Sequence, residues 1–148
     1  MKILTATNTR TASLAILILR LAVGIVFFAG GAAKMLGWFA DFGPEKTVGF
    51  YAMMGFSKFW AYLSSYTELI GGILLILGLF TRVAAFALFI NMVVAFYISL
   101  PGGFIAEHGS STPFEFMLCV LTLLIAGPMR FSLDWLIFGK KNEVIITS

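Results

Sequence analysis

Cysteine, histidine and charged residues are all scarce in this sequence of 148 residues, which has one cysteine, one histidine and 11% Lys, Arg, Asp and Glu. The single cysteine, Cys119, excludes an intramolecular disulfide, a CxxC redox pair and an iron–sulfur cluster carried by this chain alone. The single histidine, His108, excludes haem ligation by two histidines of one subunit. We therefore expect no covalently bound cofactor, and any electron transfer would need a diffusible quinone or a cofactor of a partner protein.

A phosphate-binding loop and a nucleic-acid-binding surface are also missing. The glycines fall within apolar runs and not between a strand and a helix, so they form no glycine-rich phosphate loop. The net charge of +3 comes mostly from lysines and arginines that flank these runs. Charges in such positions are typical of membrane-spanning segments, and we expect no binding to nucleic acid.

Apolar residues make up most of what remains. They account for 60% of the chain, aromatic residues for 16%, and the mean hydropathy is +1.00. A soluble domain is about 25% charged and cannot bury this much apolar surface. We expect residues 1–148 to form a single domain embedded in the lipid bilayer.

Four apolar runs are predicted to be long enough to cross a hydrocarbon core of about 30 Å, which takes about 20 residues of helix. They cover residues 13–35, 59–80, 83–100 and 114–129. The connection at 80–82 is very short, so the second and third helices must be antiparallel neighbours. The loop at 36–58 is longer, and the run at 47–56 within it predicts a short interfacial helix. The sequence therefore predicts an all-α integral membrane four-helix bundle with up-down topology.

The distribution of Lys and Arg predicts the orientation, because short loops rich in these residues stay on the cytoplasmic side. One side of the predicted bundle carries six: Lys2, Arg10, Arg82, Arg130, Lys140 and Lys141. The other side carries three: Lys34, Lys46 and Lys58. We predict a multi-pass protein of the bacterial inner membrane with both termini in the cytoplasm. An alternative interpretation of the three lysines is contact with lipid or substrate.

The first apolar run also has features of a cleavable signal peptide. Lys2 and Arg10 precede the run, and a string of small residues follows at 29–33. Arg20 interrupts the apolar stretch, which is atypical of a signal peptide, and the apolar residues around it offset the cost of inserting one arginine. We therefore favour a retained first span.

Helical spacing places small and polar residues on one face of each predicted span. Four glycines lie on these faces: Gly24, Gly31, Gly71 and Gly72. Small residues allow membrane helices to approach closely, so we assign these four to helix packing.

Glu68 interrupts the second apolar run. An ionisable side chain at bilayer depth costs about 2.5 to 3.5 kcal/mol on insertion scales, so it normally faces other helices or a wet cavity. Counting about 1.5 Å per residue brings Arg20 and Asn91 to depths within reach of Glu68. We predict that Arg20, Glu68 and Asn91 form a buried polar cluster in which Arg20 and Glu68 pair. The sequence leaves two interpretations open, a structural ion pair and a site for a ligand, a proton or a quinone.

A second polar group is expected nearer the outer face of the bundle. Its members are Lys34, Glu107, His108 and Glu115. A histidine beside a glutamate in a polar loop is typically solvated, and a carboxylate just after Pro113 suits the start of a helix. His108 with Glu107 and Glu115 would give a metal ion only one strong ligand, so we predict no metal site.

Three strings carry a resemblance to a known family. They are LRLAVGIVFFAGGAAKMLGWF, ELIGGILLILGLFTRVAAFALFINMVVAF and the later AGPMRFSLDW, and together they span residues 19–135. In order and spacing they resemble the DoxX family of small four-helix bacterial membrane proteins. The positions that match the family pattern are Arg20, Glu68, Gly71, Gly72, Thr81 and Arg82.

The resemblance implies a multi-pass protein of the bacterial inner membrane. Some relatives are similar to a subunit of a thiosulfate:quinone oxidoreductase, and others belong to membrane oxidoreductase complexes that respond to oxidative or thiol stress. We expect a non-catalytic or quinone-contacting subunit or scaffold of such a system, with a soluble or membrane redox partner. The alternative is a small transporter or lipid-handling protein that uses a buried Arg/Glu pair. The sequence is also compatible with a homodimer. An autonomous enzyme is least expected, because the sequence shows no nucleophile with a neighbouring base.

Overall fold

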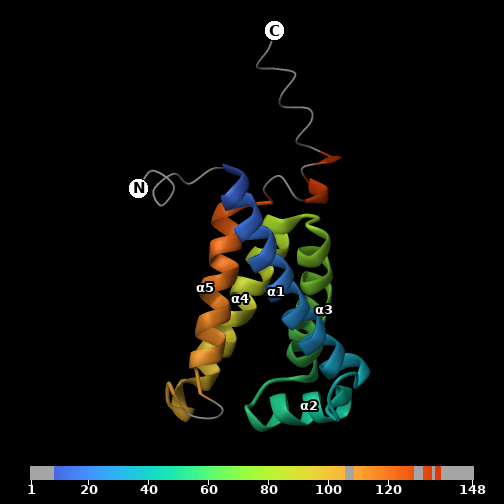
Figure 1. Cartoon of the computed structure of the whole chain (residues 1–148). Coiled ribbons are helices and arrows are strands. Elements are labelled where there is room, and N and C mark those ends of the chain that lie inside the picture. The colour runs from blue at the N-terminus through green and yellow to red at the C-terminus, as the bar shows by residue number, and fades with distance from the viewer. Residues whose placement is uncertain (1–8, 106–108, 129–131, 135, 138–148) are drawn as a thin grey trace.

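The computed structural model describes residues 9–105, 109–128, 132–134 and 136–137. Its elements are α1 (Thr9–Leu36), α2 (Gly43–Met53), α3 (Lys58–Leu77), α4 (Thr81–Ser99), the 3-10 turn η1 (Leu100–Gly102) and α5 (Ser111–Ala126) (Figure 1). This part of the chain contains no strand. The prediction of an all-α membrane bundle is confirmed.

The four predicted spans correspond to α1, α3, α4 and α5, with boundaries displaced by one to four residues. Three segments are long and apolar enough to cross a bilayer: Arg10–Leu36, Lys58–Leu77 and Thr81–Gly102. The apolar helix α5 has 16 residues, which is about 24 Å of helix and slightly less than a typical hydrocarbon core. The short helix predicted at 47–56 is also present, and it begins earlier, at Gly43.

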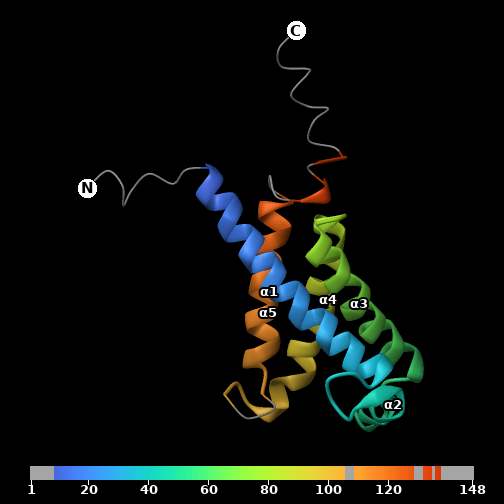
Figure 2. The same cartoon turned by 45° about the vertical axis from the view of Figure 1, so that its right-hand side comes forward.

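The helices alternate in direction, and α1 crosses the others obliquely (Figures 1 and 2). The main packing partners are α1 with α3 and α4 with α5, and α3 also packs on α4. The helix α2 lies across one end of the bundle, which we call the α2 end. The other end carries the connection between α3 and α4, and we call it the turn end. The helix α1 begins and α5 finishes at the turn end.

Glycines hold α1 and α3 in close contact. A Cβ atom added at Gly31 would lie 2.6 Å from the Cα of Leu69, and one added at Gly72 would lie 2.8 Å from the carbonyl oxygen of Gly24. Both are backbone atoms, so the two helix backbones touch at these positions. Gly71 faces α4 instead, where an added Cβ would lie 2.9 Å from the Cγ of Leu88. All four predicted packing glycines therefore lie at helix contacts.

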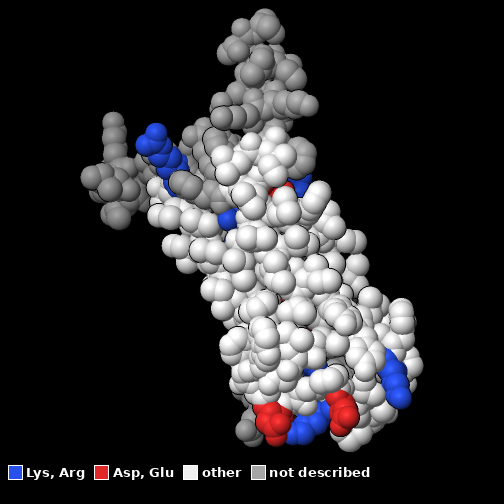
Figure 3. All heavy atoms as spheres, turned by 90° about the vertical axis from the view of Figure 1, so that its right-hand side faces the viewer, with Lys and Arg blue, Asp and Glu red and all other residues white. Residues whose placement is uncertain are grey.

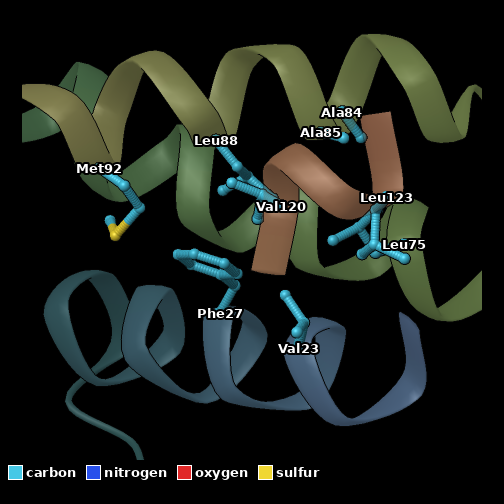
Figure 4. Close-up of a cluster of buried hydrophobic side chains, with 9 residues drawn as sticks. All are labelled: Val23, Phe27, Leu75, Ala84, Ala85, Leu88, Met92, Val120 and Leu123. Atoms are coloured by element: carbon cyan, nitrogen blue, oxygen red, sulfur yellow. The ribbon is translucent and has the colours of Figure 1, made fainter. Parts of the chain in front are cut away.

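The hydrophobic core lies where α1 faces α4 and α5. Figure 4 shows Val23 and Phe27 of α1 pointing toward Leu88 and Met92 of α4 and Val120 of α5. The ring of Phe27 also meets that of Phe116 edge to face, with centroids 5.5 Å apart. These contacts close the bundle on the side away from the glycine contact.

The outer surface suits a bilayer. On the face shown in Figure 3, the described Lys, Arg, Asp and Glu side chains gather at the two ends, and the long middle is almost wholly uncharged. Exposed aromatic residues surround the α2 end, among them Trp38, Phe39, Phe59 and Trp60. Such residues are enriched at membrane–water interfaces. The helix α2 is therefore well placed to lie along the interface.

Candidate functional site

The carboxylate of Glu68 is the centre of a buried polar cluster between three helices. The ammonium group of Lys34, on α1, donates to both carboxylate oxygens at 2.7 Å. The amide Nδ2 of Asn91, on α4, donates to Oε1 at 3.1 Å. The Glu68 side chain is 7% exposed and that of Lys34 is 28% exposed. The cluster therefore reaches from the bundle interior to the surface through the lysine.

The lack of a side chain at Gly30 leaves room for this carboxylate. A Cβ atom added at Gly30 would lie 3.3 Å from Oε2 of Glu68. The buried hydroxyl of Thr47 on α2 donates to the backbone oxygen of Gly43 at 2.7 Å and also lies 3.2 Å from the backbone oxygen of Lys34. The helix α2 therefore contacts α1 at the lysine of the cluster.

The predicted pair between Arg20 and Glu68 is wrong, although the contact between Glu68 and Asn91 is present. Arg20 donates instead to the backbone oxygen of Pro128, at 3.1 Å. Its guanidinium lies against Gly78, where an added Cβ would be 2.7 Å from Cζ. Arg20 therefore lies at the turn end and Glu68 near the α2 end.

Helix geometry explains the error. Gly31 lies beside Leu69 and is 11 residues beyond Arg20, which corresponds to about 17 Å along α1. In addition, side chains tilt toward the N-terminus of their own helix. In antiparallel helices this tilt carries the side chains of Arg20 and Glu68 away from each other. The same tilt directs Lys34, near the C-terminus of α1, inward to Glu68.

The other members of the predicted outer group do not join this cluster. Glu115 is exposed and is the fifth residue of α5, one turn later than predicted. Glu107 and His108 lie outside the described residues. Within the described ranges, no three His, Cys, Asp or Glu residues lie together in a way that could hold a metal ion.

A second polar cluster forms at the turn end around Asp134, which the sequence analysis did not single out. Its carboxylate accepts hydrogen bonds from the backbone N–H groups of Phe80 at 2.8 Å and Thr81 at 2.9 Å. Phe80 is the N-cap residue of α4 and Thr81 is its first residue, and the unpaired N–H groups at a helix start attract negative charge. Asp134 also attracts Arg20 electrostatically. A lone acidic residue in the string FSLDW is the signal that could have suggested this role.

The turn itself depends on unusual backbone conformations. Gly78 ends α3 with a φ of 66° and Phe80 precedes α4 with a φ of 47°. A positive φ is natural for glycine and uncommon for a bulky residue. The carboxylate of Asp134 binds the N–H of Phe80 directly and so stabilises this conformation.

Substituting Asp134→Asn should lower the free energy of unfolding by about 1 to 2 kcal/mol, because the amide offers one acceptor and no charge to the start of α4. Thermal unfolding in mild detergent measures the change. The matched control is Asp41→Asn, since the Asp41 side chain is fully exposed and its ion pair with Lys46 lies at the surface. Equal destabilisation by both substitutions would contradict the capping role.

A groove lies beside the Glu68 cluster, between α2, α3 and α4. Its volume is about 290 Å³. Its apolar and small lining residues are Phe56, Trp60, Leu63, Ala87, Ile90, Val94, Ala95 and Ile98, and its polar ones are Tyr51, Ser64, Thr67 and Asn91. None of these twelve residues carries a charge. The groove therefore suits a neutral molecule with a large apolar part.

The polar groups of the groove are partly paired. The hydroxyl of Tyr51 donates to Oγ of Ser64 at 2.8 Å, which ties α2 to α3. The hydroxyl of Thr67 donates to the backbone oxygen of Leu63 at 2.7 Å. Asn91 belongs both to the groove and to the Glu68 cluster. The predicted site residues Glu68 and Asn91 thus lie next to a ligand-sized groove, and Arg20 does not.

Comparisons with known proteins agree with the helical membrane architecture. A family model described as DoxX matches residues 15–100. A Bacillus subtilis protein named "Putative oxidoreductase CatD" is 33% identical over 134 residues, which covers 85% of this chain and 90% of that protein. An uncharacterized membrane protein of Mycobacterium tuberculosis is 35% identical over 133 residues, covering 80% of this chain and 78% of that protein. No solved structure matches.

Proposed function

The chain belongs to the DoxX family of membrane proteins, and from this premise we propose that it is a quinone-contacting subunit of a membrane-associated oxidoreductase system. The groove beside Asn91 is the observation that carries the proposal. It offers hydroxyl and amide groups among apolar walls, which is the usual composition of a site for a neutral small molecule. A quinone head group combines a flat apolar ring with two carbonyl oxygens and suits these walls.

The name of the Bacillus subtilis relative supports an oxidoreductase context. The present chain has a single cysteine, so it has no thiol pair of its own to exchange electrons with a quinone. We therefore assign electron transfer to a partner protein and quinone binding to this chain. Native mass spectrometry of the complex, purified in mild detergent, would detect a partner, a second copy and a bound quinone in one experiment.

Quinone binding can be measured by the fluorescence of Trp60, which lines the groove. A Trp38→Phe/Trp135→Phe background leaves Trp60 as the single tryptophan of the three. We expect a short-chain ubiquinone to quench its emission saturably. Substituting Ala87→Phe fills the groove and should weaken binding about tenfold, which is about 1.4 kcal/mol.

The matched control for this experiment is Ala22→Phe, because Ala22 is also exposed in a span and does not line the groove. Linear, non-saturable quenching that Ala87→Phe leaves unchanged would count against the proposal. A saturated lipid alcohol should not displace the ubiquinone. If it does so as well as a quinone, the groove handles lipids in general, which is the lipid-handling alternative.

The alternative of a small transporter loses its original basis, because Arg20 and Glu68 do not pair. An ionisable pair still lies near the α2 end, because Lys34 contacts Glu68 there. A flux assay would test whether this pair takes part in transport. A proteoliposome flux that Glu68→Gln abolishes would favour transport over quinone binding.

We also propose that both termini face the cytoplasm of a bacterial inner membrane. Of the six Lys and Arg residues that the sequence assigns to the side of the termini, the described ones, Arg10 and Arg82, lie at the turn end, and the three assigned to the opposite side lie at the α2 end. Lys34 is one of these three, and its charge is paired with Glu68. The difference in unpaired positive charge between the two sides is therefore larger than the counts alone suggest. A fluorescent protein fused after Ser148 should fluoresce, and alkaline phosphatase inserted in the loop at 103–109 should be active. The opposite pattern would reverse the orientation.

A further inference from the structure

We infer that Glu68 and Lys34 fix the hydrogen-bonding direction of Asn91, so that the groove prefers a ligand that bears a hydroxyl group. In terms of the proposed function, on which this inference rests, the preferred ligand is the reduced hydroquinone and not the quinone. Glu68 and Lys34 are positioning residues in this account, because they act through Asn91 and do not line the groove.

The ion pair determines what Glu68 can do. The ammonium group of Lys34 donates to both oxygens of Glu68 at 2.7 Å, so the two side chains form an ion pair. A carboxylate can only accept hydrogen bonds, whereas a protonated acid could also donate one. Any neighbour of Glu68 must therefore present a donor to it.

Asn91 meets this requirement in one orientation only. Its amide has a donor nitrogen and an acceptor oxygen. In an isolated side chain, a rotation of the amide by about 180° exchanges the positions of these two atoms. Because Nδ2 donates to Oε1 of Glu68 at 3.1 Å, the amide oxygen must point away from the carboxylate. We assign that oxygen to the groove, whose wall Asn91 forms together with Thr67.

The neighbouring hydroxyl adds a second acceptor. The proton of Thr67 is used for the backbone oxygen of Leu63, which leaves the lone pairs of its oxygen for a ligand. Ser64, one helical turn away, accepts from Tyr51 and keeps its own proton as a donor. The groove therefore presents acceptors at the level of Asn91 and a donor at the level of Ser64.

This pattern discriminates between the two redox forms of a quinone. A hydroquinone hydroxyl both donates and accepts, so it can pair at either level. A quinone carbonyl only accepts, so it pairs with Ser64 and leaves the acceptors of Asn91 and Thr67 without a partner. An acceptor that a bound ligand covers and leaves unpaired costs about 1 to 3 kcal/mol, so we expect the hydroquinone to bind about tenfold more tightly.

The test compares a singly prenylated hydroquinone with the quinone of the same skeleton, by anaerobic isothermal titration calorimetry. The protein is the full chain in mild detergent. The double variant Lys34→Met/Glu68→Gln removes both charges together, and its glutamine can donate or accept, so the amide of Asn91 is free to flip. We expect the preference for the hydroquinone to fall from about tenfold to less than about threefold, with the quinone binding no more weakly than before.

Two further variants make the test specific. Lys46→Met/Asp41→Asn removes an exposed ion pair near the same end and should keep the full preference. Asn91→Leu leaves the contact of Lys34 with Glu68 in place and should abolish the preference, which keeps the inference testable if the first double variant fails to fold.

The possible results separate the inference from the proposed function. If both redox forms bind the wild-type protein equally, the inference is wrong and quinone binding stands. If the preference survives in a folded Lys34→Met/Glu68→Gln protein, or in Asn91→Leu, the inference is again wrong. If neither form binds the wild-type protein saturably, the proposed function itself fails.

Discussion

Substituting Gly72→Leu should prevent this protein from reaching its folded state. A Cβ at this position would lie 2.8 Å from both the carbonyl oxygen of Gly24 and the Cα of Phe28. Both atoms belong to the α1 backbone, so no side-chain rotation relieves the overlap, and the helices must separate along their main contact. Overpacking costs about 1 to 3 kcal/mol where side chains can adjust and more where they cannot. We expect Gly72→Leu to lower the free energy of unfolding by at least about 4 kcal/mol, which is most of the stability of a small domain.

The measurement is the yield of monodisperse protein on size-exclusion chromatography in mild detergent, followed by thermal unfolding. Gly49→Leu is the matched control, because Gly49 lies in α2 with nothing within 4 Å of an added Cβ. It adds the same side chain without a clash. A Gly72→Leu protein as abundant and as stable as Gly49→Leu would show that the α1–α3 contact is not essential.

The helices could be predicted closely because they depend on local properties of the sequence. Apolar runs and the Gly78–Thr81 connection determine where α3 ends and α4 begins, and small residues mark the faces that touch. The exact depth of a side chain depends also on the oblique crossing of α1 and on the direction in which side chains tilt. Arg20 and Glu68 were paired in error because residue counting alone gives neither quantity.

Three other features required tertiary structure. Lys34 lies at the end of an apolar run, where lysines typically face water, and only the fold shows that it turns inward to Glu68. The groove is built from α2, α3 and α4 together, and no single helix carries its pattern. Asp134 could have been noticed as a charge in an apolar string, but its partners Phe80 and Thr81 are more than 50 positions away in the sequence.

The contact between α1 and α3 combines close backbone packing in its middle with a cation of α1 toward each end. Gly24 and Gly31 bring the backbones together in the middle, and a cation of α1 lies toward each end, Arg20 at the turn end and Lys34 at the α2 end. Each cation contacts a residue from outside α1, either Pro128 or Glu68. The close packing and the polar contacts therefore depend on each other, because a shift of α1 would break both.

Substituting Lys34→Met should be the most damaging change of a single charge. It leaves the carboxylate of Glu68, with a side chain only 7% exposed, with Asn91 as its remaining hydrogen-bond partner. Removing one partner of a buried pair costs about 3 to 5 kcal/mol, because the other charge stays buried. The lysine is 28% exposed, so water can partly replace it. We therefore expect a loss of unfolding free energy at the lower end of this range, about 3 kcal/mol.

The double variant Lys34→Met/Glu68→Gln should recover most of this loss, because removing both charges together leaves no buried ion. Unfolding of the wild type, both single variants and the double variant in one detergent gives the coupling between the two residues. Lys46→Met is the control, since its partner Asp41 is fully exposed, and it should leave the stability nearly unchanged. Additive effects of Lys34→Met and Glu68→Gln would contradict the pairing, because independent residues gain nothing from being replaced together.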